Sequence, residues 1–324
     1  MNSQHLKLWS AHAAMLGGVA GLTFGYFGRI YAPFDIFAHF TPHFAFITLS
    51  GCLAHIVSHR AGLILTLGAL LTLGIHPALS IWTALPGNGV SSGINTAQAA
   101  PPHAPPRPAQ SQALKIVSLN SWHSHPNPDA IYTFIESQNP DLIIFLEFGP
   151  NKLSLLNRLR TSYPHISHCA NRWHCSVAVL SKTPITAHGS GGPKTSIPAH
   201  AWITLNHQGR TVTIIGTHLH RPIDGMKRHR KQMFGLSKLA SEFSDAVLIA
   251  GDFNTTKWAD SYRLFKNLSG LTPMPQYIPS WPALFPQLAI DHIFHNNKLK
   301  LIQAKTSTPI GSDHLPLIAT FRLN

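Results

Sequence analysis

The chain has 324 residues, of which 44% are hydrophobic and 11% are charged, and it contains 25 Pro, 23 Gly and 3 Cys. This composition excludes a disordered chain, a collagen-like repeat and a disulfide-dense scaffold. The charged fraction is far below the roughly 25% that is usual for soluble domains. A large part of the chain is therefore expected to avoid water, although its formal net charge is +13.

The first 85 residues contain three long stretches, 8–28, 36–59 and 61–85, that have no Lys, Arg, Asp or Glu. A membrane-spanning helix needs about 20 residues, so each stretch is long enough. We predict that residues 1–85 form a transmembrane region of about three helices that contacts a lipid bilayer. Buried core helices or a signal peptide are the alternatives for the first and third stretches. The second stretch is interrupted by His39 and Pro42, so a re-entrant segment is its alternative.

The charges in the short loops predict an orientation. Lys7 and Arg60 would share one side of the membrane, while Arg29, partly offset by Asp35, would face the other. The positive-inside rule then places the N-terminus in the cytoplasm and the chain after the third span outside.

Residues 86–113 change to a composition rich in Pro, Ala, Ser and Gly. Such a segment is typical of an extended linker with little packing. The triplet Ala97-Gln98-Ala99 also resembles a small-residue cleavage site, so release of the downstream part is an alternative.

Residues 114–324 have the pattern of a globular domain with one substantial core. Strands and helices alternate irregularly along it, which favours a layered α/β or α+β fold with sheet at the centre. The predicted strands are 114–119, 142–148, 175–181, 201–205, 211–217, 246–250, 290–294 and 315–321, and the predicted helices begin at Pro128 or lie near 151–161, 226–243 and 257–268.

Polar residues that bind metals or move protons lie beside these apolar strands, mostly at their ends. They are Asn120, Glu147, His218, Asp252, Asn254, Asp291, Asp313 and His314. Carboxylate and amide oxygens are the ligands that Mg²⁺ prefers, and histidines can donate or accept protons near neutral pH. The sequence has no Cys/His cluster at zinc spacing. These residues therefore predict a site for a hard divalent cation, Mg²⁺ with Mn²⁺ as the alternative.

Six short motifs carry a resemblance to a known family. They are Ser118-Leu119-Asn120, Phe145-Leu146-Glu147, Gly216-Thr217-His218-Leu219, Gly251-Asp252-Phe253-Asn254, Ile290-Asp291-His292-Ile293 and Gly311-Ser312-Asp313-His314. Their order over residues 114–324 resembles the signature of the endonuclease/exonuclease/phosphatase superfamily. The apolar N-terminus, the linker and the stretch Pro279-Ser280-Trp281-Pro282 look like its membrane-anchored, YafD-type bacterial branch. The resemblance implies a bacterial inner-membrane protein with a periplasmic catalytic domain.

The resemblance also implies a four-layer α/β sandwich that cleaves phosphodiester bonds with a metal. Glu147 would be the main metal carboxylate, supported by Asn120 and Asp313. Asp252 would orient or deprotonate the attacking water, and Asn254 would hold a phosphate oxygen. His314, held by Asp291, would contact the scissile phosphate or transfer a proton. His218 would lie on the leaving-group side or bind a phosphate oxygen.

One departure from the family pattern and the charge bear on the substrate. Ser121 and Trp122 follow Asn120, where the abasic-site endonucleases carry an acid, so a repair role is not expected. Only 4 of the 25 basic and 1 of the 12 acidic residues precede Lys115, which leaves a net charge near +10 on the rest. Such a domain attracts polyanions. The cluster Lys227, Arg228, Arg230 and Lys231 is either a phosphate track or a solvated helix face.

We therefore expect a phosphodiesterase that acts on nucleic acid. The alternatives are a phospholipid or sphingomyelin-type phosphodiesterase, a phosphatase of small phosphate esters, and a non-catalytic module that binds an anion. Cys169 and Cys175 flank a short turn between two predicted strands. They are expected either to form a disulfide, as suits an oxidising compartment, or to be two buried thiols.

Overall fold

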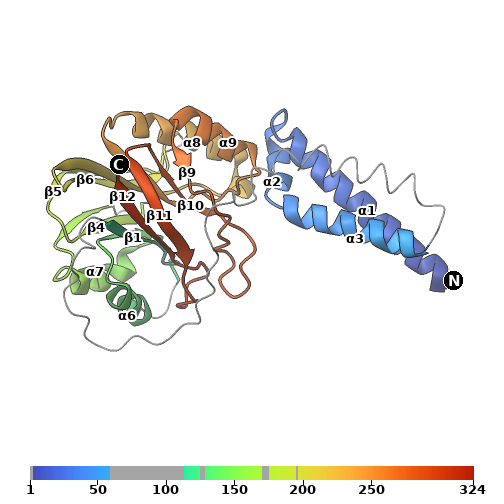
Figure 1. Ribbon diagram of the computed structural model, residues 1–324, viewed down its shortest axis with the longest axis horizontal. Helices are drawn as coiled ribbons and strands as arrows, with labels where there is room; N and C mark the ends of the chain where they lie inside the picture. The colour runs from blue at the N-terminus through green and yellow to red at the C-terminus, as the bar shows by residue number, and fades with distance from the viewer. Residues whose placement is uncertain (1–2, 59–112, 125–127, 170–174, 195) are drawn as a thin grey trace.

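The computed structural model describes residues 3–58, 113–124, 128–169, 175–194 and 196–324. An N-terminal helical hairpin consists of α1 (Ser3–Phe27), the short turns η1 (Ala32–Phe34) and α2 (Asp35–Ala38), and α3 (Thr41–Ser58). It extends from one end of a compact sandwich (Figure 1). The predicted third span, nearly all of the linker and its cleavage triplet lie outside the described residues.

The sandwich contains two six-stranded mixed sheets. In spatial order the first sheet consists of β11 (Leu299–Thr306), β12 (Leu317–Leu323), β1 (Ala113–Asn120), β2 (Leu142–Leu146), β4 (Val177–Ser181) and β3 (His165–His168). The second consists of β5 (Ile185–Gly191), β6 (Ala199–His207), β7 (Arg210–His218), β8 (Ala246–Asp252), β10 (Asp291–His295) and β9 (Thr272–Pro273). All eight predicted strands are confirmed, with ends shifted by a few residues, and β3, β5, β9 and β11 were not predicted.

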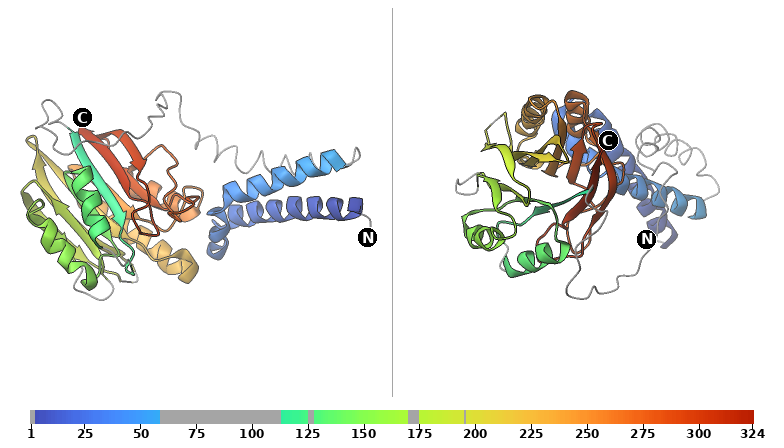
Figure 2. Two further views of the ribbon diagram at one scale, coloured as in Figure 1. Left: turned by 90° about the horizontal axis from the view of Figure 1, so that it is seen from below. Right: turned by 60° about the vertical axis from the view of Figure 1, so that its left-hand side comes forward.

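Helices cover the outer face of each sheet, which gives four layers (Figure 2). The outer face of the first sheet packs on α6 (Pro128–Gln138) and α7 (Leu153–Leu159), and that of the second packs on α8 (Met226–Ser241) and α9 (Asp260–Ser269). Alternate residues of a strand point to opposite faces. Ile144 accordingly lies in the core between the sheets, whereas Ile143 packs against the helices. The predicted four-layer α/β sandwich is confirmed.

The strand register brings the predicted polar residues to one end of the sandwich. β1 is parallel to β2, with Asn120 opposite Leu146, so Glu147 follows directly beyond this pair. β7 is parallel to β8, and His218 lies opposite Asp252. β10 is antiparallel to β8, so its first residue, Asp291, also lies opposite Asp252. The pairing of the strands alone therefore makes neighbours of residues that are far apart in sequence.

The two long helices of the hairpin pack closely through small residues. A Cβ atom on Gly18 would lie 2.2 Å from Thr48 Oγ1, and one on Gly51 would lie 2.6 Å from the backbone nitrogen of Met15. The outward faces carry exposed apolar side chains: Trp9, Leu16, Phe46, Leu49, Leu53 and Ile56.

The second predicted span is not one continuous helix. Within the described residues, no single helix is both long and apolar enough to cross a membrane. A bent pair, Ala32–Ala38 with Thr41–Ile56, meets the criteria of length and composition, with an angle of 63° between its two parts. The stretch 36–59 is therefore divided in the region where His39 and Pro42 interrupt it: α2 ends at Ala38, and α3 begins at Thr41, next to Pro42, a residue favoured in the first turn of a helix.

Cys169 and Cys175 form a disulfide, with their Cα atoms 5.3 Å apart. The expectation of a bond is confirmed, and the alternative of two buried thiols is wrong. Cys52 is a free, buried cysteine in α3.

Gly251 allows β7 and β8 to approach at the end that carries the polar residues. Its φ is +155°, and a Cβ atom there would lie only 1.9 Å from the carbonyl oxygen of Thr217. A side chain would push β8 away from β7 and displace the neighbouring Asp252. This explains in physical terms why glycine precedes the aspartate of this motif.

We predict that Gly251→Ala lowers the free energy of unfolding by more than about 3 kcal/mol, because backbone strain and overpacking add at this position. The measurement is urea unfolding of the full chain followed by tryptophan fluorescence. Gly209→Ala is the control, since Gly209 also has a positive φ, +78°, but nothing lies within 4 Å of the added Cβ. That variant is expected to lose about 1 kcal/mol. Equal losses in the two variants would contradict the role of the Thr217 contact.

Candidate active site

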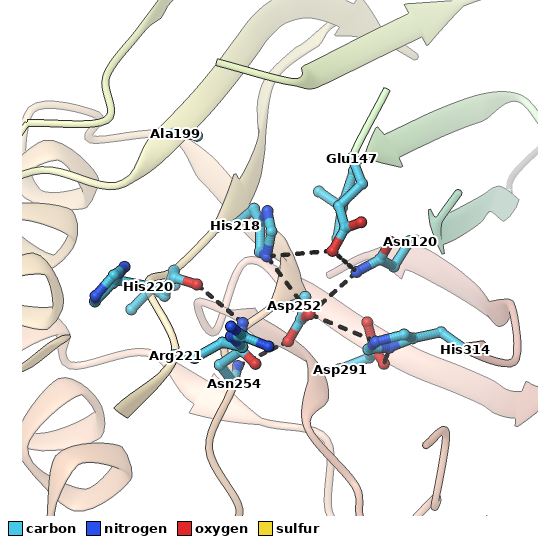
Figure 3. A network of polar contacts seen from close by, with 12 residues as sticks. Asn120, Glu147, Ala199, His218, His220, Arg221, Asp252, Asn254, Asp291 and His314 are labelled. Atoms are coloured by element: carbon cyan, nitrogen blue, oxygen red, sulfur yellow. Dashed lines mark hydrogen bonds and ion pairs between the residues drawn. The ribbon is translucent and has the colours of Figure 1, made fainter. Parts of the chain in front are cut away.

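A cleft of about 560 Å³ opens at the end of the sandwich where the polar strand ends meet. Of the predicted residues, Glu147, His218, Asp252, Asn254, Asp313 and His314 line it. Asn120 and Asp291 lie directly behind this wall and hydrogen bond to residues in it. Figure 3 shows the resulting network of side chains from both sheets. The structure therefore brings all eight predicted site residues together.

Glu147 is held as a carboxylate at the end of β2. Its backbone has a positive φ of +50°, a conformation that is uncommon for a residue other than glycine and recurs at functional sites. Oε1 accepts a hydrogen bond from Asn120 Nδ2 at 3.1 Å, and Oε2 accepts one from the backbone N–H of His123 at 3.0 Å. Burial alone would raise the pKa, but the charge of His218 and these hydrogen bonds outweigh it and lower the pKa of Glu147 to about 2.

Asp252 is the most deeply enclosed carboxylate of the cleft, with 2% of its surface exposed. Oδ1 accepts a hydrogen bond from the backbone N–H of Asn254 at 2.8 Å, and Oδ2 accepts one from Asn120 Nδ2 at 3.2 Å. Burial raises the pKa of Asp252 to about 6, against the opposing charges of His314 and His218. The two carboxyl groups that share the Asn120 amide thus have well-separated pKa values.

Asp291 and His314 form a buried pair. His314 Nδ1 donates to Asp291 Oδ2 at 2.7 Å, and the same oxygen accepts a hydrogen bond from Ser280 Oγ at 2.6 Å. Burial lowers the pKa of His314, but the charge and hydrogen bond of Asp291, together with Asp252 and Asp313, raise it to about 10. The imidazole is therefore protonated at neutral pH. Its Nε2 faces Asp252 Oδ2 at 3.7 Å, at the wall of the cleft.

His218 and Asn254 complete the polar wall. His218 Nε2 lies 3.9 Å from Glu147 Oε1 and 3.7 Å from Asp252 Oδ2, between the two carboxylates. Asn254 has a φ of +50° and donates one Nδ2 hydrogen to the carbonyl of Leu219 at 2.9 Å. An amide nitrogen has two hydrogens, so the second can be donated to another oxygen atom.

The residues present fit a hard divalent cation. Asp313 Oδ1 is buried and has no hydrogen-bond partner among the described residues, although Asp313 lines the cleft. An unpaired buried carboxylate oxygen is costly unless a cation or donor compensates it. Glu147 remains ionised at any physiological pH, as a metal carboxylate must. Both predicted metal carboxylates therefore line the same cleft.

A second group of possible ligands includes residues for which the resemblance implies catalytic roles. Oxygen or nitrogen atoms of Asp252, Asp291 and His314 lie within 4.8 Å of one another. His314, however, is protonated, and its Nδ1 is engaged by Asp291. A metal could bind its Nε2 only after that proton is released, so cation binding by this group competes with protonation of His314.

Four residues that support the site were not predicted to act there. His123 and Lys152 hold the loop after β1: His123 Nδ1 lies 3.0 Å from Glu147 Oε2, and the buried Lys152 Nζ donates to the carbonyl of Trp122 at 2.8 Å. Ser280 hydrogen bonds to Asp291, and Ser312 Oγ donates to the carbonyl of Asn120 at 2.7 Å. Ser280 and Ser312 lie inside motifs that the sequence singled out, whereas His123 and Lys152 have no comparable signal.

The comparisons with known proteins agree with this geometry. The Endonuclease/Exonuclease/phosphatase family matches residues 117–314, so the chain belongs to that family. A UPF0294 protein of Vibrio parahaemolyticus is 28% identical over 157 residues, which are 46% of this chain and 54% of that protein. The chain thus spans about half the length of this curated relative.

Solved structures share the fold at low sequence identity. An endonuclease/exonuclease/phosphatase family protein from Bacteroides thetaiotaomicron superposes with a TM-score of 0.56 at 15% identity, over 65% of this chain and 98% of that one. A beta toxin from Staphylococcus aureus, solved with bound magnesium ions, gives a TM-score of 0.53 at 19% identity, over 64% of this chain and 98% of that one. At such identities the likeness establishes the fold alone.

The Asp291–His314 pair predicts a pH dependence of stability. Because the folded-state pKa of His314 is raised above the ordinary value of about 6.5, the pair stabilises the fold fully below pH 6.5. This stabilisation is lost as the pH rises toward 10. Asp291→Asn removes the first of the three charges that raise the pKa, together with the hydrogen bond to Nδ1. The histidine is therefore expected to titrate well below pH 10 in metal-free protein, with a loss of about 3 kcal/mol in the free energy of unfolding at pH 6.

The measurement combines NMR titration of the His314 ring with urea unfolding at pH 6 and pH 10. Asp224→Asn is the control, because Asp224 forms an exposed ion pair with Arg221. That change is expected to cost less than about 1 kcal/mol. A histidine that still titrates near pH 10 in Asp291→Asn would show that Asp291 is not the cause.

Proposed function

We propose that the protein is a membrane-anchored hydrolase that cleaves phosphodiester bonds with the help of Mg²⁺ or Mn²⁺. The observation that carries the proposal is the geometry of one cleft, where Glu147 and Asp252 lie beside the hydrogen-bonded Asp291–His314 pair. The pKa values of these groups differ in a way that suits catalysis. Glu147 is a fixed anion, Asp252 has a pKa near 6, and His314 is a fixed cation. Such a separation is what general acid–base chemistry at neutral pH requires. The magnesium ions bound to the beta toxin of the same fold favour Mg²⁺.

Each side chain has a role that follows from its contacts. Glu147 and Asp313, with Asn120 beside them, would hold the cation, which supplies positive charge against the phosphate oxygens. Asp252 orients and deprotonates the attacking water, because its pKa lies close to neutral pH. His314 donates from Nε2 to a phosphate oxygen and is kept protonated by Asp291. His218 serves the leaving-group side, and Asn254 donates its remaining amide hydrogen to the phosphate.

Nucleic acid is the first substrate candidate, and the charge supports it. The catalytic domain carries a net charge near +10, and the exposed Lys227 and Lys231 lie on α8, whose N-terminal end follows the cleft residues 218–224. Only part of the predicted basic cluster is available, however, because Arg230 pairs with Asp260 at 2.7 Å. The exposed lysines can attract phosphates without base contacts, which favours binding that depends on salt more than on sequence.

A phospholipid-type phosphodiester is the second candidate, favoured by the apolar rim of the cleft. Ile223 lines the cleft and is 75% exposed. Leu284 and Phe285, 92% and 70% exposed, lie in the loop between the lining residues Trp281 and Leu288. Exposed apolar groups at this density commonly mark contact surfaces. They suit a substrate presented by a membrane.

The hairpin supports a bacterial inner-membrane location with a periplasmic domain. α1 is about 37 Å long, more than the roughly 30 Å of a bilayer core, although it is not apolar enough to qualify as a span by itself. The bent pair Ala32–Ala38 with Thr41–Ile56 meets the criteria of both length and composition. The tip of the hairpin faces the sandwich, and its open end points away (Figure 1). If α1 and α3 cross the membrane, a third crossing must return the chain to the domain, as the three-span topology proposes. The Cys169–Cys175 disulfide suits an oxidising periplasm.

The test is cleavage of supercoiled plasmid and release of headgroup from labelled phospholipid vesicles, both by the full chain in detergent with Mg²⁺ or Mn²⁺. Asp252→Asn is expected to lower the rate on the true substrate by 10² to 10⁴, in the range typical of a lost general base, and chelation with EDTA should abolish it. Asp129→Asn, the same change in an exposed ion pair with Arg158 that does not line the cleft, should retain full activity.

Cleavage of plasmid alone would select nucleic acid, and headgroup release alone would select phospholipid. Full activity of folded Asp252→Asn would refute the assignment of the base. Binding of either substrate without turnover at any divalent ion would instead support the non-catalytic, anion-binding alternative.

A further inference from the structure

The tip of the N-terminal hairpin is attached to the catalytic domain by a buried carboxylate. Asp35, which is fully buried, accepts hydrogen bonds from the backbone N–H groups of Asp260 at 2.6 Å and Ser261 at 3.0 Å. These are the first two residues of α9. The N-cap position of α9 is Ala259, whose side chain cannot accept a hydrogen bond. Asp35 therefore satisfies helix N–H groups that the local sequence leaves open.

A second contact attaches the tip to a different part of the sandwich. His43 Nε2 lies 2.6 Å from Gln287 Oε1, and Gln287 belongs to the loop that carries Leu284 and Phe285. The tip is thus fastened to α9 and to this loop, which are two different parts of the sandwich. The segment between the two attachments, residues 36–42, is held across one side of the cleft.

Three residues of this segment line the same cleft as the catalytic residues: Ile36, His39 and Phe40. Phe40 is 40% exposed, so its ring is accessible. His39 is 4% exposed, and its Nε2 has no hydrogen-bond partner within the described parts of the chain. The wall that they form is mainly apolar, and it is supplied by a part of the chain that precedes the catalytic domain by more than 70 residues.

We propose that this tip is a substrate-recognition wall of the active site, with Phe40 and Ile36 as specificity-determining residues and Asp35 as the positioning residue. The wall would bind an apolar group attached to the phosphate of the diester, beside Trp281 and Leu288, which also line the cleft. This inference rests on the proposed phosphodiesterase function and assigns the substrate class of that site. The catalytic domain without the hairpin would keep its acid–base residues and lose this selectivity.

Two small diesters with the same leaving group test the wall. Bis(4-nitrophenyl) phosphate and methyl 4-nitrophenyl phosphate both release 4-nitrophenolate and differ in the group that remains on the phosphate. Phe40→Ala in the full chain is expected to lower kcat/KM for the aryl diester at least tenfold, through KM, and to change that for the methyl diester less than twofold. Phe46→Ala, which removes an exposed ring of α3 that does not line the cleft, is the control. Equal effects on the two diesters would overturn the proposal.

The same pair of substrates tests Asp35. Asp35→Ala should reproduce the loss of selectivity. Asp35→Asn should retain only part of the selectivity, because the N–H groups of Asp260 and Ser261 bind separate oxygens of Asp35 and asparagine has a single acceptor oxygen. The double variant Asp35→Ala/Ala259→Ser gives α9 a cap of its own but leaves the tip without its contact to α9. It should remain unselective; recovery of wild-type selectivity would show that Asp35 acts only on helix stability and would overturn the positioning role.

A nucleoside ester and a hexadecyl ester of 4-nitrophenyl phosphate identify the kind of apolar group. Both are expected to lose affinity in Phe40→Ala, and the larger loss marks the natural class. If the wild type hydrolyses none of these diesters with Mg²⁺ or Mn²⁺, that result counts against the proposed function and does not test the wall. The wall is then tested by calorimetric binding of diphenyl phosphate, which Phe40→Ala should weaken at least fivefold relative to dimethyl phosphate. Unchanged binding would refute the wall.

Discussion

The buried carboxylate of Asp252 is the constraint around which the site is arranged. A charged group enclosed to this extent is costly unless donors and opposite charges surround it. Here a backbone N–H binds one oxygen, an asparagine amide binds the other, and two imidazoles lie at 3.7 Å. These partners come from both sheets. Stabilising one anion therefore fixes how the two halves of the sandwich meet.

The arrangement also explains why neighbouring acids differ in proton affinity. Asn120 donates to Glu147 and to Asp252 through the same nitrogen, so neither carboxylate is favoured by that residue alone. For Glu147 the charge of His218 and two further contacts from His123 outweigh desolvation, whereas for Asp252 desolvation dominates. The difference between a permanent anion and a titratable base thus arises from depth in the fold and from one loop, not from residue type.

The sequence predicts those parts of the structure that depend on local pattern. Buried strands such as Leu142–Leu146 are continuous apolar runs, and the polar residue that follows each run marks the end of the sheet where the site forms. Edge strands are harder to predict: β5 and β11 are largely exposed and carry polar residues, and β3 is only four residues long. The roles of Lys152 and His123 depend on how a loop folds over Glu147, and no local spacing encodes that.

The contact between hairpin and cleft was beyond prediction for a related reason. Asp35 was interpreted as a loop charge that bears on membrane orientation, because the acceptor it provides is needed 225 residues later in the chain. The contact of Asp35 with α9 depends on Ala259, whose side chain cannot cap the first N–H groups of that helix. Nothing in the sequence marks this alanine as an N-cap position. The buried acid of one element thus supplies the helix cap that the other element lacks. Through that interaction an apolar hairpin is joined to the wall of a polar cleft.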